Sequence, residues 1–130
     1  MSAIDHLGIA VKSLADAKGF YEKLGLKPMP EETVAAEQVR LSMVPVGESR
    51  IELLEPTSPD SPIAKFLAKR GEGLHHVGYR VDDCAQALAS VKEHGHRVID
   101  EVPRPGSRGT TVAFVHPKGS FGTLIELVQE

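Results

Sequence analysis

The stretch Asp5-His6-Leu7-Gly8-Ile9-Ala10-Val11 has a near copy 70 residues later, His75-His76-Val77-Gly78-Tyr79-Arg80-Val81. In both copies a glycine stands two residues after a histidine, and a valine stands five residues after it. Each half of the chain later contains a glutamate inside an apolar segment, in Ile51-Glu52-Leu53-Leu54 and in Ile125-Glu126-Leu127-Val128. The same features in the same order predict an internal repeat, and therefore two copies of one structural module.

The first copy predicts the order strand, helix, strands. A strand over 3–11 precedes a helix that begins after Ser13 and ends at Gly25, because serine caps helices and glycine ends them. Further strands are expected near 38–46 and 49–55.

The second copy predicts the same order. A strand over 75–81 leads to a helix that begins at Asp82-Asp83 and ends at Gly95. The remaining strands are expected near 96–101, 110–115 and 123–129.

Neither module is expected to fold alone, because about 55–65 residues can hardly bury a sheet. We therefore expect one domain over residues 1–130 with a shared core. Module one covers about 1–56, a linker helix about 60–71 and module two about 74–130. Ser61 as a cap and Pro62 at the first helical position predict the linker helix.

Side chains alternate along a strand, so His6, Gly8 and Ala10 are expected on the face away from the helix. Gly8 and Ala10 are small, which leaves room on that face for something other than protein. His76 takes the equivalent place in the second copy, and alternation puts the glutamate of each closing strand on the same face.

The two glutamates have two interpretations. A carboxylate inside an apolar strand carries a desolvation cost unless it is paired, hydrogen-bonded or bound to a metal. Either Glu52 and Glu126 are solvated residues on amphipathic strands, or they join His6 and His76 as ligands of one divalent metal. The repeat favours the metal, because without one the occurrence of a histidine and a glutamate at the same places in both modules would be two independent coincidences.

Two imidazoles and two carboxylates suit Co2+, Ni2+, Zn2+, Mn2+ or Fe2+. A fourth protein ligand favours Lewis-acid chemistry over oxygen activation. The other histidines have weaker claims: alternation puts His75 on the helix face, and His94 and His96 are expected at a surface helix end and turn. His116 begins a turn that could line the cleft.

Composition excludes several functions. The net charge is -3 and no basic stripe indicates nucleic acid. No apolar run approaches the ~20 residues of a membrane helix and the N-terminus has no signal-peptide pattern, so we expect a cytoplasmic protein. The single cysteine, Cys84, excludes an internal disulfide and is expected to be a small helix residue.

The order of these motifs resembles the vicinal oxygen chelate superfamily, and within it the methylmalonyl-CoA epimerase family. Each segment is weakly specific, but together they span essentially the whole chain. The segments that carry the resemblance are Ile4–Val11, Ile51–Pro56, Asp60–Leu67, Gly71–His76, His116–Lys118 and Leu124–Val128.

The resemblance implies an α+β fold in which two tandem βαβββ modules form a cupped, barrel-like mixed sheet around a metal site. It implies that His6, Glu52, His76 and Glu126 hold the metal, although some epimerases carry glutamine at the place of Glu52. We expect Co2+, with Ni2+, Mn2+ and Zn2+ as alternatives. Superfamily members often dimerise, so we expect a homodimer.

The implied reaction inverts C2 of methylmalonyl-CoA by 1,1-proton transfer through a metal-stabilised enolate. Glu126 is our first choice for the base, Glu52 the second and Glu37 a distant third. Some epimerases carry a further carboxylate after a Gln-Gly-Val-Arg-like stretch. This chain has Leu41 where that carboxylate would fall.

Two alternatives remain open at the level of sequence. One is a glyoxalase I-type lactoylglutathione lyase, which has the same ligand set and a different substrate. The other is a metal-free small-molecule-binding protein of the same fold, which four ligand-type residues in register disfavour. Arg104, Arg108 and Lys118 are loop cations that either meet CoA phosphates or are scattered surface charge.

Overall fold

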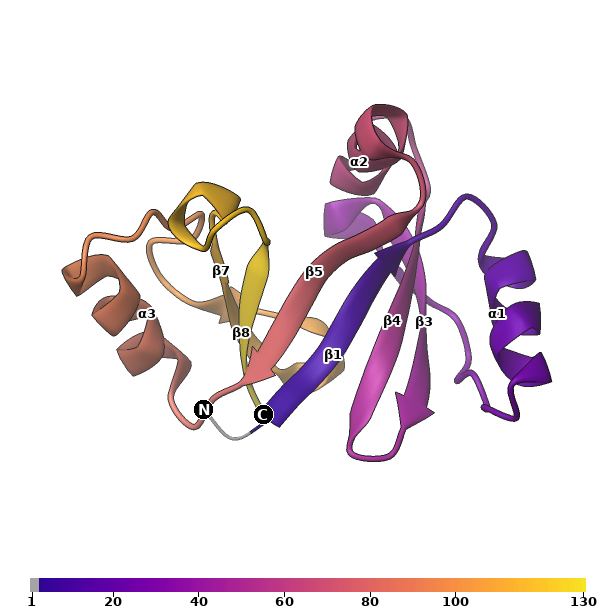
Figure 1. Ribbon diagram of the computed structural model, residues 1–130, viewed down its shortest axis with the longest axis horizontal. Coiled ribbons are helices and arrows are strands. Elements are labelled where there is room, and N and C mark those ends of the chain that lie inside the picture. The colour runs from indigo at the N-terminus through magenta and orange to yellow at the C-terminus, as the bar shows by residue number, and fades with distance from the viewer. Residues whose placement is uncertain (1–2) are drawn as a thin grey trace. The chain divides into compact units, whose positions relative to one another are not determined.

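The computed structural model describes residues 3–130 (Figure 1). Each half of the chain has the order strand, helix and three strands, the βαβββ order that the family resemblance implies. The first half contains β1 (Ala3–Ala10), α1 (Leu14–Lys23), β2 (Glu32–Val34), β3 (Val39–Val46) and β4 (Ser49–Pro56). After α2 (Pro62–Arg70), the second half contains β5 (Gly73–Arg80), α3 (Cys84–Glu93), β6 (Arg104–Pro105), β7 (Thr111–Val115) and β8 (Ile125–Gln129). Short 3-10 turns lie at Ala35–Glu37, Ser107–Gly109 and Pro117–Gly119.

All eight strands belong to one mixed sheet, in the order β2-β3-β4-β1-β5-β8-β7-β6. In the first half β1 is parallel to β4, and β4 is antiparallel to β3. In the second half β5 is parallel to β8, and β8 is antiparallel to β7. The strand pairing therefore repeats in the same pattern as the sequence motifs.

The helices begin where the sequence predicts. The Ser13 hydroxyl accepts a hydrogen bond from the Asp16 amide at 3.1 Å, and the Ser61 hydroxyl accepts one from Ile63 at 3.1 Å. The Asp83 carboxylate caps α3 in the same way. These bonds satisfy amide groups that have no partner inside the helix, which explains why the helices begin there. Among the described residues, no helix has the length and apolar character needed to cross a bilayer.

The strand predicted near 96–101 is wrong. Only Val98 forms an isolated bridge there, opposite Val115, and the third strand of the second half is the two-residue β6. The Asp100 carboxylate accepts a hydrogen bond from the Phe114 amide at 2.8 Å. A side chain therefore occupies the donor that a regular ladder would have used. The short strand β2 was not expected, because its three residues are too few to show alternation.

The chain divides into two compact units, and each has its own apolar packing. The unit His6–His75 has two clusters. One packs against α1 and includes Val11, Leu14, Val44 and Leu53. The other packs against α2 and includes Ala10, Val39, Leu41, Met43, Leu54 and Ile63. The division of the chain into one domain of two modules with the expected boundaries stays a prediction.

The cluster under α2 corrects one expectation. Ala10 is fully buried among Leu41, Leu54 and Ile63, so protein fills the space beside Ala10 that was expected to be open. The other unit combines the described residues up to Asp5 with His76–Glu130. Its apolar cluster packs α3 on β7 and β8 and includes Val81, Cys84, Leu88, Ala113, Val115 and Leu127.

Candidate metal centre

In the unit His6–His75, one histidine and one glutamate form a buried pair. Strand register places Gly8 beside Glu52, and alternation puts His6 on the same face of the sheet. The His6 Nε2 atom lies 3.7 Å from Glu52 Oε1. The two residues are 2% and 7% exposed, so neither side chain is well solvated.

The other unit contains an equivalent pair. Gly78 lies beside Glu126 in the β5–β8 ladder, and His76 shares their face. The His76 Nε2 atom lies 3.1 Å from Glu126 Oε1, and the two residues are 4% and 9% exposed. The Phe114 ring stands edge-on to the imidazole of His76 at 5.9 Å between ring centroids. The same strand register thus places an equivalent buried His–Glu pair in each copy.

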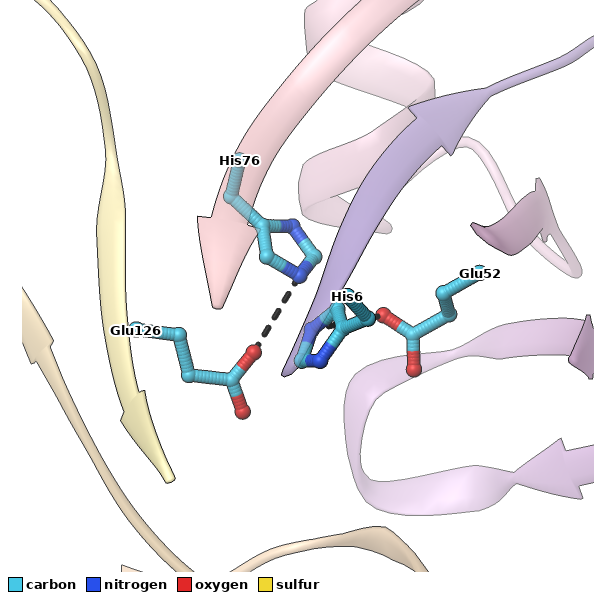
Figure 2. Close-up of side chains that lie close together, drawn as sticks. All are labelled: His6, Glu52, His76 and Glu126. Carbon is cyan, nitrogen blue, oxygen red and sulfur yellow. Dashed lines mark ion pairs between the residues drawn. The ribbon is translucent and has the colours of Figure 1, made fainter. Parts of the chain in front are cut away.

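Together these four residues form a group that could bind a divalent metal (Figure 2). Each offers one ligand atom, and these atoms lie within 4.8 Å of one another. Imidazole nitrogens with carboxylate oxygens are a donor set that transition metals accept. Two buried carboxylates are costly without a compensating positive charge, and a divalent cation would supply it. The residues present therefore fit a metal.

The other histidines lie elsewhere. His75 packs edge-on against the Phe66 ring of α2, with 5.0 Å between the centroids. His94 and His96 are exposed at the end of α3 and in the turn after it, which confirms their predicted surface position. His116 caps the 3-10 turn Pro117–Gly119. Burial lowers the pKa of His116, and the charges of Arg97 and Lys118 lower it further.

The position where some relatives would offer another carboxylate is apolar here. Leu41 is buried in the apolar cluster under α2. The nearest acidic residue in sequence, Glu37, is exposed in the 3-10 turn before β3.

Two of the loop cations have carboxylate partners. Arg104 forms an ion pair with Asp100 at 3.2 Å and lies over the Phe114 ring, 5.2 Å from its centroid. Arg108 donates a hydrogen bond to Asp5 at 3.1 Å. Lys118 is exposed.

The sequence analysis missed the buried carboxylate of Asp5. It is fully buried and accepts hydrogen bonds from Arg108 and from the guanidinium of Arg80, at 3.2 Å for Arg80 Nη2. The sequence did contain a signal for its burial. Alternation along the strand puts Asp5 on the same face as the apolar Leu7 and Ile9, and not on the face of His6. Such a carboxylate needs cationic partners, and the chain supplies two.

Comparison with known proteins places the chain in a family. Residues 5–114 match the Glyoxalase/Bleomycin resistance protein/Dioxygenase superfamily, and the chain belongs to it. It is 37% identical to the mitochondrial methylmalonyl-CoA epimerase of Bos taurus, over 99% of this chain and 75% of that protein. It is 36% identical to the ethylmalonyl-CoA/methylmalonyl-CoA epimerase of Cereibacter sphaeroides, over 97% and 96%.

A solved structure gives the same picture. It is a variant of Streptomyces coelicolor methylmalonyl-CoA epimerase in complex with 2-nitronate-propionyl-CoA. The two chains share 38% identity and a TM-score of 0.95, over all of this chain and 95% of the other. The predicted α+β fold class and the predicted family are both confirmed.

Proposed function

We propose that this protein is a metal-dependent methylmalonyl-CoA epimerase, which inverts C2 of its acyl-CoA substrate by 1,1-proton transfer. One observation carries the proposal: a buried His–Glu pair occurs in the same strand register in both copies. The similarity to epimerases over nearly the whole chain supports the choice of substrate.

His6, Glu52, His76 and Glu126 are the residues that would hold the metal. When bound, a divalent cation would stabilise the negative charge that develops on the thioester oxygen as C2 loses its proton. Co2+ is the metal we expect, with Ni2+, Mn2+ and Zn2+ as alternatives that share the preference for this donor set.

The carboxylates are the groups of this site that can exchange a proton with C2. We assign Glu126 as the first base: its carboxylate takes the C2 proton, and the electron pair of the C–H bond delocalises into the thioester carbonyl. Inversion then needs a proton delivered to the opposite face, and Glu52, the equivalent residue of the other copy, delivers it from a protonated carboxyl group. Glu126 is then protonated and Glu52 ionised, and proton exchange with solvent restores both for the next turnover. One proton leaves C2 and one returns, so the reaction consumes none.

Leu41 strengthens the assignment of Glu52. Its buried apolar surroundings leave no base at that position, and the exposed Glu37 lies on a turn. In the β1–β4 ladder, Glu52 lies beside Gly8, on the face of the sheet that carries His6. The next residue of β4 on that face is the apolar Leu54. We therefore infer that this chain works without the carboxylate that some epimerases carry there.

The test is proton exchange at C2 of methylmalonyl-CoA in D2O, measured by mass and by loss of optical activity. We expect exchange in the metal-loaded protein, its loss after chelation and its return when Co2+ is added. Glu126→Gln and Glu52→Gln should each lower the rate by at least about 100-fold, the scale of general acid–base catalysis. Glu101→Gln is a matched control, because its side chain is 75% exposed.

Absence of exchange in metal-loaded protein would remove the epimerase proposal. The same protein assayed with methylglyoxal and glutathione would then test the glyoxalase alternative. If the metal-free protein bound methylmalonyl-CoA as tightly as the metal-loaded protein does, that result would instead support a small-molecule-binding protein. The homodimer and the cytoplasmic location stay predictions, and sedimentation of the purified chain tests the dimer.

A further inference from the structure

The turn between β7 and β8 (Figure 1) contains one phenylalanine, Phe121. Phe121 is 98% exposed, more than any other large apolar residue among those described. Its φ is 60°, in the left-handed region that non-glycine residues seldom adopt. An aromatic side chain in a disfavoured backbone conformation with no apolar burial contributes nothing to folding. Such an outlier is a reason to look for a function.

The turn that carries Phe121 is fixed by its backbone. Gly119 donates a hydrogen bond to the His116 carbonyl at 2.7 Å, and Gly122 donates one to the Pro117 carbonyl at 2.7 Å. A Cβ on Gly119 would lie 2.5 Å from the Arg97 carbonyl oxygen, so the turn packs directly on that segment. The backbone of the turn that contains Phe121 is therefore fixed by these hydrogen bonds and by its packing on the Arg97 segment.

Two cationic residues, Lys118 and Arg97, lie in or next to this turn. Lys118 and Arg97 are both exposed, and both charges contribute to lowering the pKa of His116, after burial itself. No aspartate or glutamate occurs between Glu101 and Glu126 in the sequence. The turn that contains Phe121 thus also contains the exposed Lys118 and packs on the backbone of the exposed Arg97. We call Phe121, Lys118 and Arg97 the Phe121 patch.

The Phe121 patch lies within reach of the candidate metal centre. Phe114 pairs with Glu126 in the β7–β8 ladder, and the turn begins just beyond the next pair, Val115 and Ile125. Phe121 precedes Glu126 by five residues, so their Cα atoms are at most about 18 Å apart. The pantetheine arm of an acyl-CoA is long enough to bridge such a separation.

We propose that the Phe121 patch binds the nucleotide end of the acyl-CoA, with the adenine stacked on Phe121 and the phosphates facing Lys118 and Arg97. This inference rests on the proposed function, since it assumes an acyl-CoA ligand. Exposed aromatic rings are platforms for bases, and neighbouring cations attract phosphate groups. The methylmalonyl group of the substrate has neither a base that could stack on Phe121 nor a phosphate that could face the two cations.

Fluorescence provides a direct binding test. The chain contains no tryptophan, so Phe121→Trp introduces a single reporter. Because the side chain at this position is almost wholly exposed, the variant should fold. We expect coenzyme A and adenosine 3′,5′-bisphosphate to quench its emission and pantetheine to leave it unchanged. Equal quenching by pantetheine, or none by the bisphosphate, would overturn the proposal.

Kinetics tests the same point in the catalytic reaction. Stacking of one base is worth about a 5- to 150-fold change in affinity, so Phe121→Ala should raise KM for methylmalonyl-CoA by that factor, with a smaller effect on kcat. The KM increase should shrink with methylmalonyl-pantetheine, which has no nucleotide. Val102→Ala is the control, because Val102 is also exposed and lies outside the patch.

The two proposals fail in different ways. Active enzyme whose KM is the same in Phe121→Ala and wild type would overturn the Phe121 patch and leave the epimerase intact. Wild-type protein without epimerase activity would overturn the function, and the fluorescence titration would still decide whether the patch binds a nucleotide.

Discussion

The most informative perturbation is removal of the metal, because its effect on stability can be calculated. A ligand that binds only the folded state at 100 times its Kd stabilises a protein by about 2.7 kcal/mol. For 130 residues the unfolding entropy near 60 °C is about 0.27 kcal/mol/K. Saturating metal should therefore raise the melting temperature by about 10 °C over the chelated protein, measured by calorimetry.

The ligand variants extend this calculation. Loss of one carboxylate ligand should weaken metal binding at least tenfold, which leaves about 1.4 kcal/mol and a shift near 5 °C at the same metal concentration. Without metal, Glu52→Gln should be at least as stable as wild type, because the apo protein then buries one carboxylate fewer. Glu101→Gln should keep the full shift.

This reasoning would be refuted by a metal-induced shift of the same size in wild type, Glu52→Gln and Glu126→Gln. It would also be refuted if chelation left the melting temperature of wild type unchanged in protein shown by elemental analysis to have carried metal. A fall in apo stability on Glu52→Gln would show that the glutamate is held by protein hydrogen bonds rather than reserved for a cation.

Three further predictions concern other parts of the chain. Leu41→Glu should destabilise the fold by about 3–5 kcal/mol in urea denaturation, because it places an uncompensated charge in the cluster under α2; unchanged stability would show that this position admits water. Ser61→Ala should cost about 1 kcal/mol by the same method, since it removes the cap of α2, and a loss below the error of the measurement would contradict the cap. Burial, then the charges of Asp83 and other acids, raises the pKa of the Cys84 thiol above its ordinary value of 9.0. Native protein should thus react slowly with iodoacetamide at pH 8.5. The neutral thiol is favoured in the fold, so its stabilisation is present below pH 9 and is lost as pH rises above the unfolded pKa. Cys84→Ala should decline less between pH 8 and 10, and an equal decline would count against it.

The repeat made most of the fold predictable. Local signals set the helix ends at Ser13, Ser61 and Asp83, because each cap bonds an amide two or three residues away. The same repeat aligned two histidines and two glutamates, so the members of the candidate site could be selected before their geometry was known.

What the sequence could not predict depends on distant partners. In place of the strand expected at 96–101, the backbone amide of Phe114 donates a hydrogen bond to the Asp100 carboxylate. Asp5 takes its cationic partners from 75 and 103 residues away, and no local pattern reports such separations. Ala10 was expected to face open space, but the linker helix fills it through Ile63.

The close approach of Gly119 to the Arg97 carbonyl has a consequence for how this protein can vary. A side chain at position 119 would push two backbone segments apart, so that position is restricted to glycine for as long as the 96–98 segment stays where it is. The side chains of the neighbouring Lys118 and Phe121 meet no such backbone contact, because both are exposed. Related proteins could therefore differ at positions 118 and 121, which we propose contact the nucleotide end of the substrate, while the β7–β8 hairpin that carries Glu126 keeps its structure.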